Sequence, residues 1–344
     1  IRRLLPSHNL PGRDPQALSF EGQLIGDVTA ATINRLQLDI GVSRLRGALT
    51  YQAAEARPRI DLDVIATNLQ QWSWLPANAG GETLVDNISL FDLSALNLFD
   101  GQCDIAFENL TMAAMDLKSG TISAALDTGV LDFQVRDIRF GKGDMNLSGR
   151  LAGGPLPTVS LQGEASNVVI AELDLVGGFA ARRGQGDLDF TLRSVGETWR
   201  DMFQNLSGSG SVSVTDVIVT GSDLTALAGA VTAKQGSVAG FVTAAQKALK
   251  TGHTEFSKVK TKFAVNDGII RSADIQMEGD AVVGRAAMAI NLPAEEMDLK
   301  MRFRLRLPDN VPIFGLRLTG PIKRPRRTMD LDALRDYVSA RRGS

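Results

Sequence analysis

The feature that most constrains this fold is a strict alternation of apolar and charged residues, clearest in residues 298–308, DLKMRFRLRLP. A repeat of two is the period of a β-strand, in which successive side chains leave opposite faces of the sheet. Such a strand has one wholly apolar face and one wholly basic face. Its apolar residues are Leu299, Met301, Phe303, Leu305 and Leu307, and its basic residues are Lys300, Arg302, Arg304 and Arg306.

The same alternation recurs along the chain, separated roughly every ten residues by Gly, Asn, Asp or Pro, which predicts many short antiparallel strands. In LDFQVRDIRF the apolar phase slips between Val135 and Ile138, and in GSVSVTDVIVTG it slips between Val214 and Val217. About 20 such strands, spaced by about 4.8 Å, would form a ribbon on the order of 100 Å long. The apolar positions of other segments are Leu131, Phe133 and Val135; Leu188, Phe190 and Leu192; and Val259, Phe263 and Val265.

Turn and helix signals are few. The segment KVKTKFAVNDGIIRSADIQM predicts a hairpin whose turn holds Asn266, Asp267 and Gly268. Residues 222–252 carry apolar stripes at helical spacing, which predicts two helices or one broken helix, capped by Ser222 or Asp223. We expect another short helix within TMDLDALRDYVSARR at the C-terminus and a further one within DNISLFDLSALNLFDG. The pattern therefore predicts a mainly β chain.

The charge is divided unevenly along the chain. The 344 residues carry a net charge of -2, which gives no overall attraction to nucleic acid or membrane. Residues 300–344, however, hold twelve Lys and Arg against four Asp, a net charge of +8, so the first 299 residues carry -10. Aromatic residues do not alternate with these basic charges, and we therefore expect no nucleic-acid binding.

The sequence offers little for catalysis. It has two histidines, His8 and His253, in unrelated contexts, and one cysteine, Cys103, at a strand-like position. A histidine metal cluster, a Ser-His-Asp site and an internal disulfide are accordingly not expected, and we predict no enzymatic activity and no cofactor. Paired carboxylates alternate with apolar residues, which favours their assignment to the solvent-exposed face of a strand over a glycosidase-like catalytic pair. They are Asp61 and Asp63, Asp187 and Asp189, and Asp330 and Asp332.

Three stretches, taken in order, resemble the C-terminal region of the AsmA family. They are LSGSGSVSVTDVIVTGSDLTAL, then TEFSKVKTKFAVNDGIIRSADIQMEGDAVVGRAAMAINLPAEEMDLKMRFRL, then VPIFGLRLTGPIKRPRRTMDLDAL. Upstream, GALTYQAAEARPRIDLDVIATNLQQWSWLP and GDMNLSGRLAGGPLPTVSLQGEASNVVIAELDLVGG are similar to the preceding repeats of that family. The resemblance covers residues 18–335 and depends on the order of the segments, since no single motif is specific.

The resemblance implies a protein of the Gram-negative envelope, anchored in the inner membrane by an N-terminal helix. Its periplasmic part would be a long curved antiparallel sheet with an apolar groove, with helices near 222–252 and the C-terminus, that conducts phospholipid toward the outer membrane without chemistry. This chain begins at Ile1 and has no apolar run of about 18 residues, so we expect a fragment without the anchor. The expected organisation is a connector at 1–17, β-groove repeats at 18–160, the C-terminal region at 161–335 with a helical insertion at 222–252, and a tail at 336–344.

Two interpretations of the apolar faces stay open. They line a groove for phospholipid acyl chains, or they are packed shut inside a scaffold for outer-membrane protein assembly, with other envelope proteins as partners in either case. For the groove, the expected lining is Leu299, Met301, Phe303, Leu305, Leu307, Val259, Phe263, Val265, Leu188, Phe190, Leu192, Leu131, Phe133 and Val135.

The basic residues also have two interpretations. Rows such as Lys258, Lys260 and Lys262, or Arg302, Arg304 and Arg306, either contact anionic headgroups or form a solvated face that prevents edge-to-edge aggregation. In PIKRPRRTMD, the candidates for contact with headgroups or a membrane are Lys323, Arg324, Arg326 and Arg327. Trp72 and Trp74 mark either the mouth of a groove or part of a core.

Overall fold

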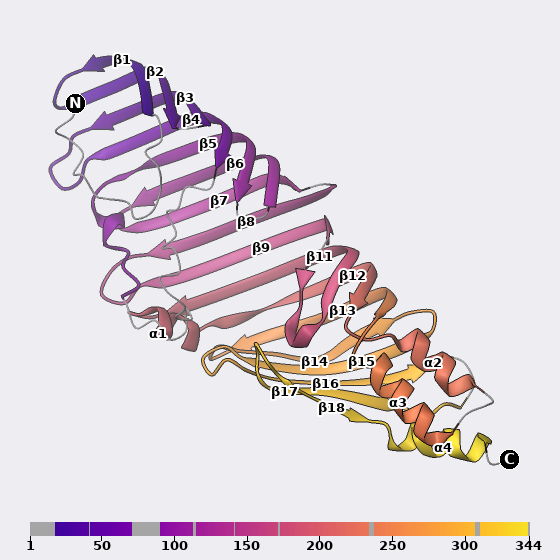
Figure 1. The fold of residues 1–344 in the computed structure, drawn as a ribbon. Coiled ribbons are helices and arrows are strands. Elements are labelled where there is room, and N and C mark those ends of the chain that lie inside the picture. The colour runs from indigo at the N-terminus through magenta and orange to yellow at the C-terminus, as the bar shows by residue number, and fades with distance from the viewer. Residues whose placement is uncertain are drawn as a thin grey trace.

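The computed structural model is dominated by a single sheet of eighteen strands, which is not closed into a barrel (Figure 1). It describes residues 18–40, 42–70, 90–112, 115–140, 142–170, 173–233, 237–306 and 310–342. The predicted long, mainly β, curved sheet with few helices is thus confirmed. The strands are β1 (Leu18–Gly26), β2 (Ala30–Ile40), β3 (Ser43–Gln52), β4 (Arg59–Gln70), β5 (Asp100–Met112), β6 (Met115–Asp127), β7 (Val130–Phe140), β8 (Gly143–Ala152), β9 (Thr158–Val169), β10 (Leu173–Asp174), β11 (Ala180–Val195), β12 (Ser207–Thr220), β13 (His253–Asn266), β14 (Ile269–Glu278), β15 (Val282–Asn291), β16 (Glu296–Leu305), β17 (Phe314–Pro321) and β18 (Arg326–Asp330).

Neighbouring strands follow one another in chain order, with β9 pairing directly with β11 and the short β10 pairing with the start of β11. The pairs are antiparallel except for β4 and β5, which run parallel. A parallel pair requires a crossover connection of a dozen or more residues, and residues 71–99 provide it. The 3-10 helix Ser94–Asn97 occupies part of the third segment in which a helix was expected. The predicted division of the chain at residue 160 falls within β9 and stays a prediction.

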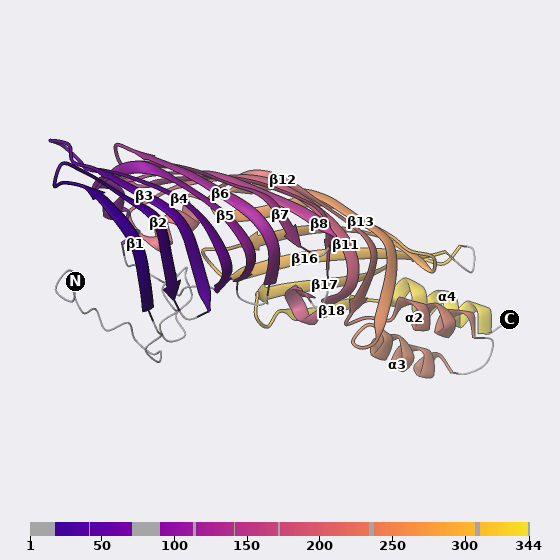
Figure 2. The ribbon, with the colours of Figure 1, turned by 90° about the horizontal axis from the view of Figure 1, so that it is seen from above.

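Non-glycine residues in the left-handed conformation recur in strands that run in one direction, in the middle of β2 and in the second half of the other strands. They explain why the strands bend as Figure 2 shows. Where the sequence phase slips between Val135 and Ile138, the pairing of β7 with β8 shifts register. Such bulges add one residue to a strand, bend it and increase its twist. The left-handed residues are Arg35 in β2, Asn68 in β4, Asn109 in β5, Asp137 in β7, Asn167 in β9 and Asp216 in β12.

The bulge in β9 gives a direct test of this curvature. Asn167 has a φ of 53°, and its backbone N–H donates to a carboxylate oxygen of Asp187 at 2.9 Å. Left-handed backbone costs a residue with a Cβ about 1–2 kcal/mol, most of all a β-branched one, and costs glycine almost nothing. We expect Asn167→Val to lose about 1–2 kcal/mol of unfolding free energy in urea titrations, while Asn167→Gly stays close to the wild type. Equal stability of the two variants would contradict the bulge.

Three helices cover the apolar face of the sheet at its C-terminal end. They are α2 (Leu224–Thr232), α3 (Val238–Ala248) and α4 (Asp332–Arg342), and the chain also has a short α1 (Trp199–Gln204). The side chain of Asp223 caps α2 by accepting from the Ala226 N–H at 2.7 Å. Leu227, Phe241 and Val338 of these helices are buried in one core with Phe303 and Leu318 of the sheet.

A second, smaller core lies in the N-terminal half and is formed by strand residues alone among the described residues. Its buried members include Leu36 and Ile138, which directly follow the left-handed residues Arg35 and Asp137. The bend at each bulge therefore folds the apolar face toward itself. Between the two cores, none of the described helices and neither of the two cores buries the apolar face.

Candidate functional site: the apolar face of the sheet

The apolar face is closed at its C-terminal end. The side chains of Leu299, Met301, Phe303 and Leu305 are 8%, 8%, 5% and 3% exposed and belong to the core that includes the three helices. Val265 of β13 is buried too but belongs to neither core, whereas Leu307 lies outside the described residues. The alternation that was most regular in the sequence therefore lies in the most densely covered part of the sheet. The role of these residues as groove lining stays a prediction.

The middle of the same face is open. Leu188 of β11 is 37% exposed, and the neighbouring apolar side chains on β7, β11 and β13 are half-buried. Several of these residues belong to neither core, so this stretch joins the two cores as an apolar surface that no other described element covers, on the face that the helices cover farther along. The predicted lining residues in this open stretch are Leu131, Phe133, Leu188, Phe190, Leu192 and Phe263, while Val135 and Val259 pack at the margins of the two cores.

Phenylalanine rings on this face lie across glycines of the adjacent strands. Phe190 is the register partner of Gly163, and a Cβ placed on Gly163 would lie 2.5 Å from the Phe190 ring. Rings in this position shield the glycine backbone and lie along the sheet instead of standing away from it. The floor of the open stretch is consequently smooth and apolar. Four further pairs have the same geometry: Phe107 with Gly120, Phe133 with Gly149, Phe263 with Gly210, and Phe303 with Gly284.

These pairs predict an unusual sensitivity to one added methyl group. Gly163→Ala should lower the free energy of unfolding by about 1 kcal/mol, at the low end for overpacking, because the new Cβ displaces the outer end of the half-buried Phe190 ring. Gly229→Ala is the matched control, since no atom lies within 4 Å of its Cβ position and it is exposed on α2. That variant should gain up to about 1 kcal/mol from helix propensity. Urea unfolding measures both, and no loss for Gly163→Ala would refute the ring placement.

The glycine partners were not among the site residues predicted from the sequence. Gly163 in SLQGEAS and Gly149 in NLSGRLA interrupt otherwise alternating strands. A glycine inside a strand often marks a place where another group approaches the backbone closely. That signal, combined with a phenylalanine in the neighbouring strand, points to such pairs only once the register of the strands is known.

Two members of the carboxylate pairs noted in the sequence, Asp61 and Asp187, accept hydrogen bonds from backbone N–H groups of neighbouring strands. Asp61 accepts from the Arg59 guanidinium at 2.9 Å and from the Gln102 N–H at 2.9 Å, and Asp187 accepts from Asn167. Among the described residues, no three His, Cys, Asp or Glu side chains lie close enough together to hold a metal ion. Cys103 is half-buried in β5, and desolvation raises the pKa of its thiol.

The basic residues near the C-terminus fall into two groups. Lys323, Arg324 and Arg326 are exposed, whereas Arg327 is partly buried. The Arg327 guanidinium donates to the carbonyl oxygens of Gly177, Gly221 and Leu249 at 2.8–3.1 Å, and it lies 4.6 Å from the centre of the Phe179 ring. Desolvation lowers its pKa. Arg327 thus joins β18 to the segments that carry α3 and β11, and the contact of all four residues with headgroups stays a prediction.

Comparisons with known proteins agree with the resemblance seen in the sequence. The model of the AsmA family matches residues 29–275, which is more than half of the chain. Comparison with curated proteins and with solved structures gives no match. In the part of the chain that the structure describes, no helix is both long enough and apolar enough to cross a membrane. An open, curved, mainly β sheet and a family match over most of its length lead to one assignment: the chain belongs to the AsmA family.

Proposed function

We propose that this chain is a non-enzymatic conduit for acyl lipids, phospholipids foremost, between the inner and outer membranes of a Gram-negative envelope. In this proposal it is the periplasmic part of a protein anchored in the inner membrane. The observation that supports it best is the uncovered apolar stretch around Leu188 and Phe190, which lies between two buried cores on one continuous sheet. An exposed apolar surface of this kind commonly marks a binding site.

Physical chemistry supports acyl chains as the ligand. Burial of each CH₂ group contributes about 0.8 kcal/mol, so a lipid tail lying along several strands is held without any specific pocket. The predicted lining residues of the open stretch, such as Phe133 and Leu192, are apolar, and none of them offers a hydrogen bond to a headgroup. Neighbouring positions are nearly equivalent, and a lipid can therefore slide from one strand to the next. Transport of this kind needs no reacting group.

The second candidate is a scaffold that supports assembly of outer-membrane proteins through its surface. The observation that favours it is the C-terminal core, where α2, α3 and α4 seal the apolar face and where Leu318 and Leu334 are fully buried. In a scaffold the open stretch would carry no lipid. The two candidates therefore differ in what the purified protein contains.

Lipid extraction and native mass spectrometry of the purified chain separate the two candidates. We expect bound phospholipid and, in addition, transfer of labelled phospholipid between donor and acceptor vesicles when the protein is added. A stable, lipid-free protein that transfers nothing would favour the scaffold. Washing the protein with apolar resin before the transfer assay should empty the surface and leave transfer intact, because the empty face is ready to bind lipid again.

A further inference from the structure

The polar face of β15, β16 and β17 places like charges directly opposite one another. Arg285 lies opposite Arg302, and Lys300 lies opposite Arg317. Like charges facing each other across two strands destabilise a sheet. A sheet face that only has to stay solvated does not need such pairs, because positive and negative side chains placed opposite one another would keep it equally well hydrated. The arrangement therefore needs compensating anions, supplied either by the chain or from outside.

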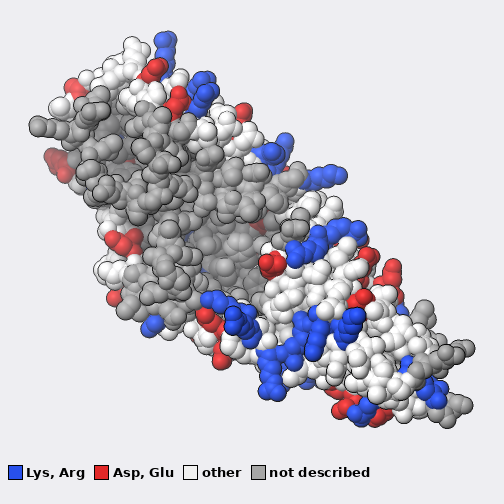
Figure 3. Space-filling model, in the orientation of Figure 1, with Lys and Arg blue, Asp and Glu red and all other residues white. Residues whose placement is uncertain are grey.

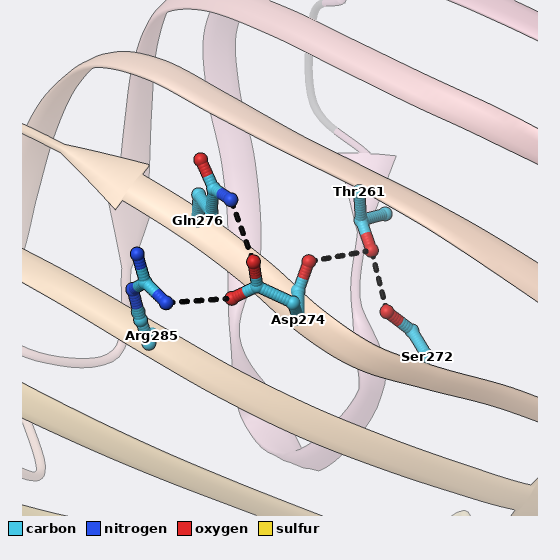
Figure 4. A network of polar contacts seen from close by, with 5 residues as sticks. All are labelled: Thr261, Ser272, Asp274, Gln276 and Arg285. Atoms are coloured by element: carbon cyan, nitrogen blue, oxygen red, sulfur yellow. Dashed lines mark hydrogen bonds and ion pairs between the residues drawn. The ribbon is translucent and has the colours of Figure 1, made fainter.

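Neutralisation within the chain is incomplete. Arg317 is paired with Asp298 at 2.6 Å, and Arg285 lies 3.8 Å from Asp274, which also accepts from Gln276 (Figure 4). Arg302 and Arg304 are exposed and have no acidic partner among the described residues. The network around Asp274 thus compensates one side of the like-charge pair and leaves the other side free for an external anion.

The shape of this region suits a surface that carries many phosphates. A hollow of about 610 Å³ is lined by Arg285, Arg302, Arg304 and Arg306, with Glu278 as its one acidic residue. Ile313 also lines it and is 49% exposed. Figure 3 shows Lys and Arg side chains across the C-terminal part of the molecule. We call the four arginines the basic face.

We propose that the basic face docks this protein on an anionic lipid bilayer. Guanidinium groups bind phosphate with two parallel hydrogen bonds, and a row of them on a rigid strand meets many headgroups at once. The exposed Ile313 side chain beside them can enter the interfacial region of the bilayer.

The uneven charge of the chain favours docking by its C-terminal end, because residues 300–344 carry +8 and the rest of the chain carries -10. An acidic protein partner is the alternative that the experiment must exclude. The inference extends the proposed lipid conduit by giving its C-terminal end a membrane to contact.

Vesicle co-sedimentation of the purified chain tests this. Vesicles of phosphatidylcholine with about 30% phosphatidylglycerol should bind the protein, vesicles of phosphatidylcholine alone should not, and raising salt from about 0.1 M to about 0.5 M should release it. The variant Arg302→Glu with Arg304→Glu should bind roughly 30-fold more weakly or worse. Replacing the same two residues by Lys should retain most of the binding, since the charge is kept.

The matched control is Lys118→Glu with Lys142→Glu, which changes the net charge equally but lies on β6 and before β8, far along the sheet. It should bind vesicles as the wild type does. Equal losses of binding in the two charge-reversed proteins, binding that does not depend on phosphatidylglycerol, or no vesicle binding by the wild type would each overturn the inference.

The lipid content of the purified protein is measured separately. A lipid-loaded protein with no charge-dependent docking refutes this inference alone, whereas a docking protein that carries no lipid refutes the proposed function alone.

Discussion

Leu188→Arg is expected to abolish lipid binding and vesicle-to-vesicle transfer while the protein remains folded. Leu188 lies in the open stretch of the apolar face and is 37% exposed, so an arginine can reach water there without disrupting a core. A lipid tail, in contrast, would have to pass a charged group in an apolar slot, and burying an unpaired charge costs several kcal/mol. Because the tails slide along one continuous face, a single charge should block the path.

Thr191→Arg is the matched control for this variant. Thr191 is exposed on the same strand, three residues farther along, and its side chain leaves the opposite face of the sheet. It adds the same charge and the same length, but not in the proposed path. Extracted phospholipid and the transfer rate should be unchanged for Thr191→Arg and lost for Leu188→Arg, with circular dichroism confirming that both are folded. Normal transfer by Leu188→Arg would remove this face from the transport route.

Much of the fold could be predicted because period-two alternation fixes both the strand and its two faces. The slip between Val135 and Ile138 coincides with a bulge, because one added residue moves the following apolar side chains to the other phase of the alternation while they stay on the same face. The Asn266-Asp267-Gly268 turn was equally readable, as Asp267 and Gly268 adopt the positive φ that such residues tolerate. Strand faces and tight turns can be predicted in this way because they depend on residues that are close together in the sequence.

Other features depend on contacts between residues far apart in the sequence, which the alternation of apolar and polar residues does not predict. The parallel pairing of β4 with β5 is set by where the chain returns after residues 71–99. The stretch with the clearest alternation, around Phe303, is the one that α2, α3 and α4 cover, because any uniformly apolar face is also the best site for a helix to pack. A pattern of apolar residues identifies the face but does not say whether it is open or covered. The Phe–Gly pairs likewise require the register of two strands.

Two phenylalanines on this one face provide the sharpest measure of which part is open. Phe303 is 5% exposed, packs 5.7 Å from Phe314 between ring centres, and lies beneath the helices. Phe303→Ala should therefore leave a cavity and lower the free energy of unfolding by about 3–5 kcal/mol. Phe133 makes the equivalent contact with Gly149 but is half-buried in the open stretch. Since Phe133 is half-buried and no described helix covers it, Phe133→Ala should cost less than about half as much.

The comparison is internally controlled, because both variants remove the same atoms from a ring that lies over a glycine of the next strand. Urea unfolding gives the two losses, and hydrogen exchange on β7 and β16 shows where each loss is felt. Equal, large losses of unfolding free energy would mean that the middle of the sheet is as tightly enclosed as its C-terminal end. Lipid could then pass along neither part. A small loss at Phe133 together with a large loss at Phe303 is the outcome that a trough sealed at one end requires.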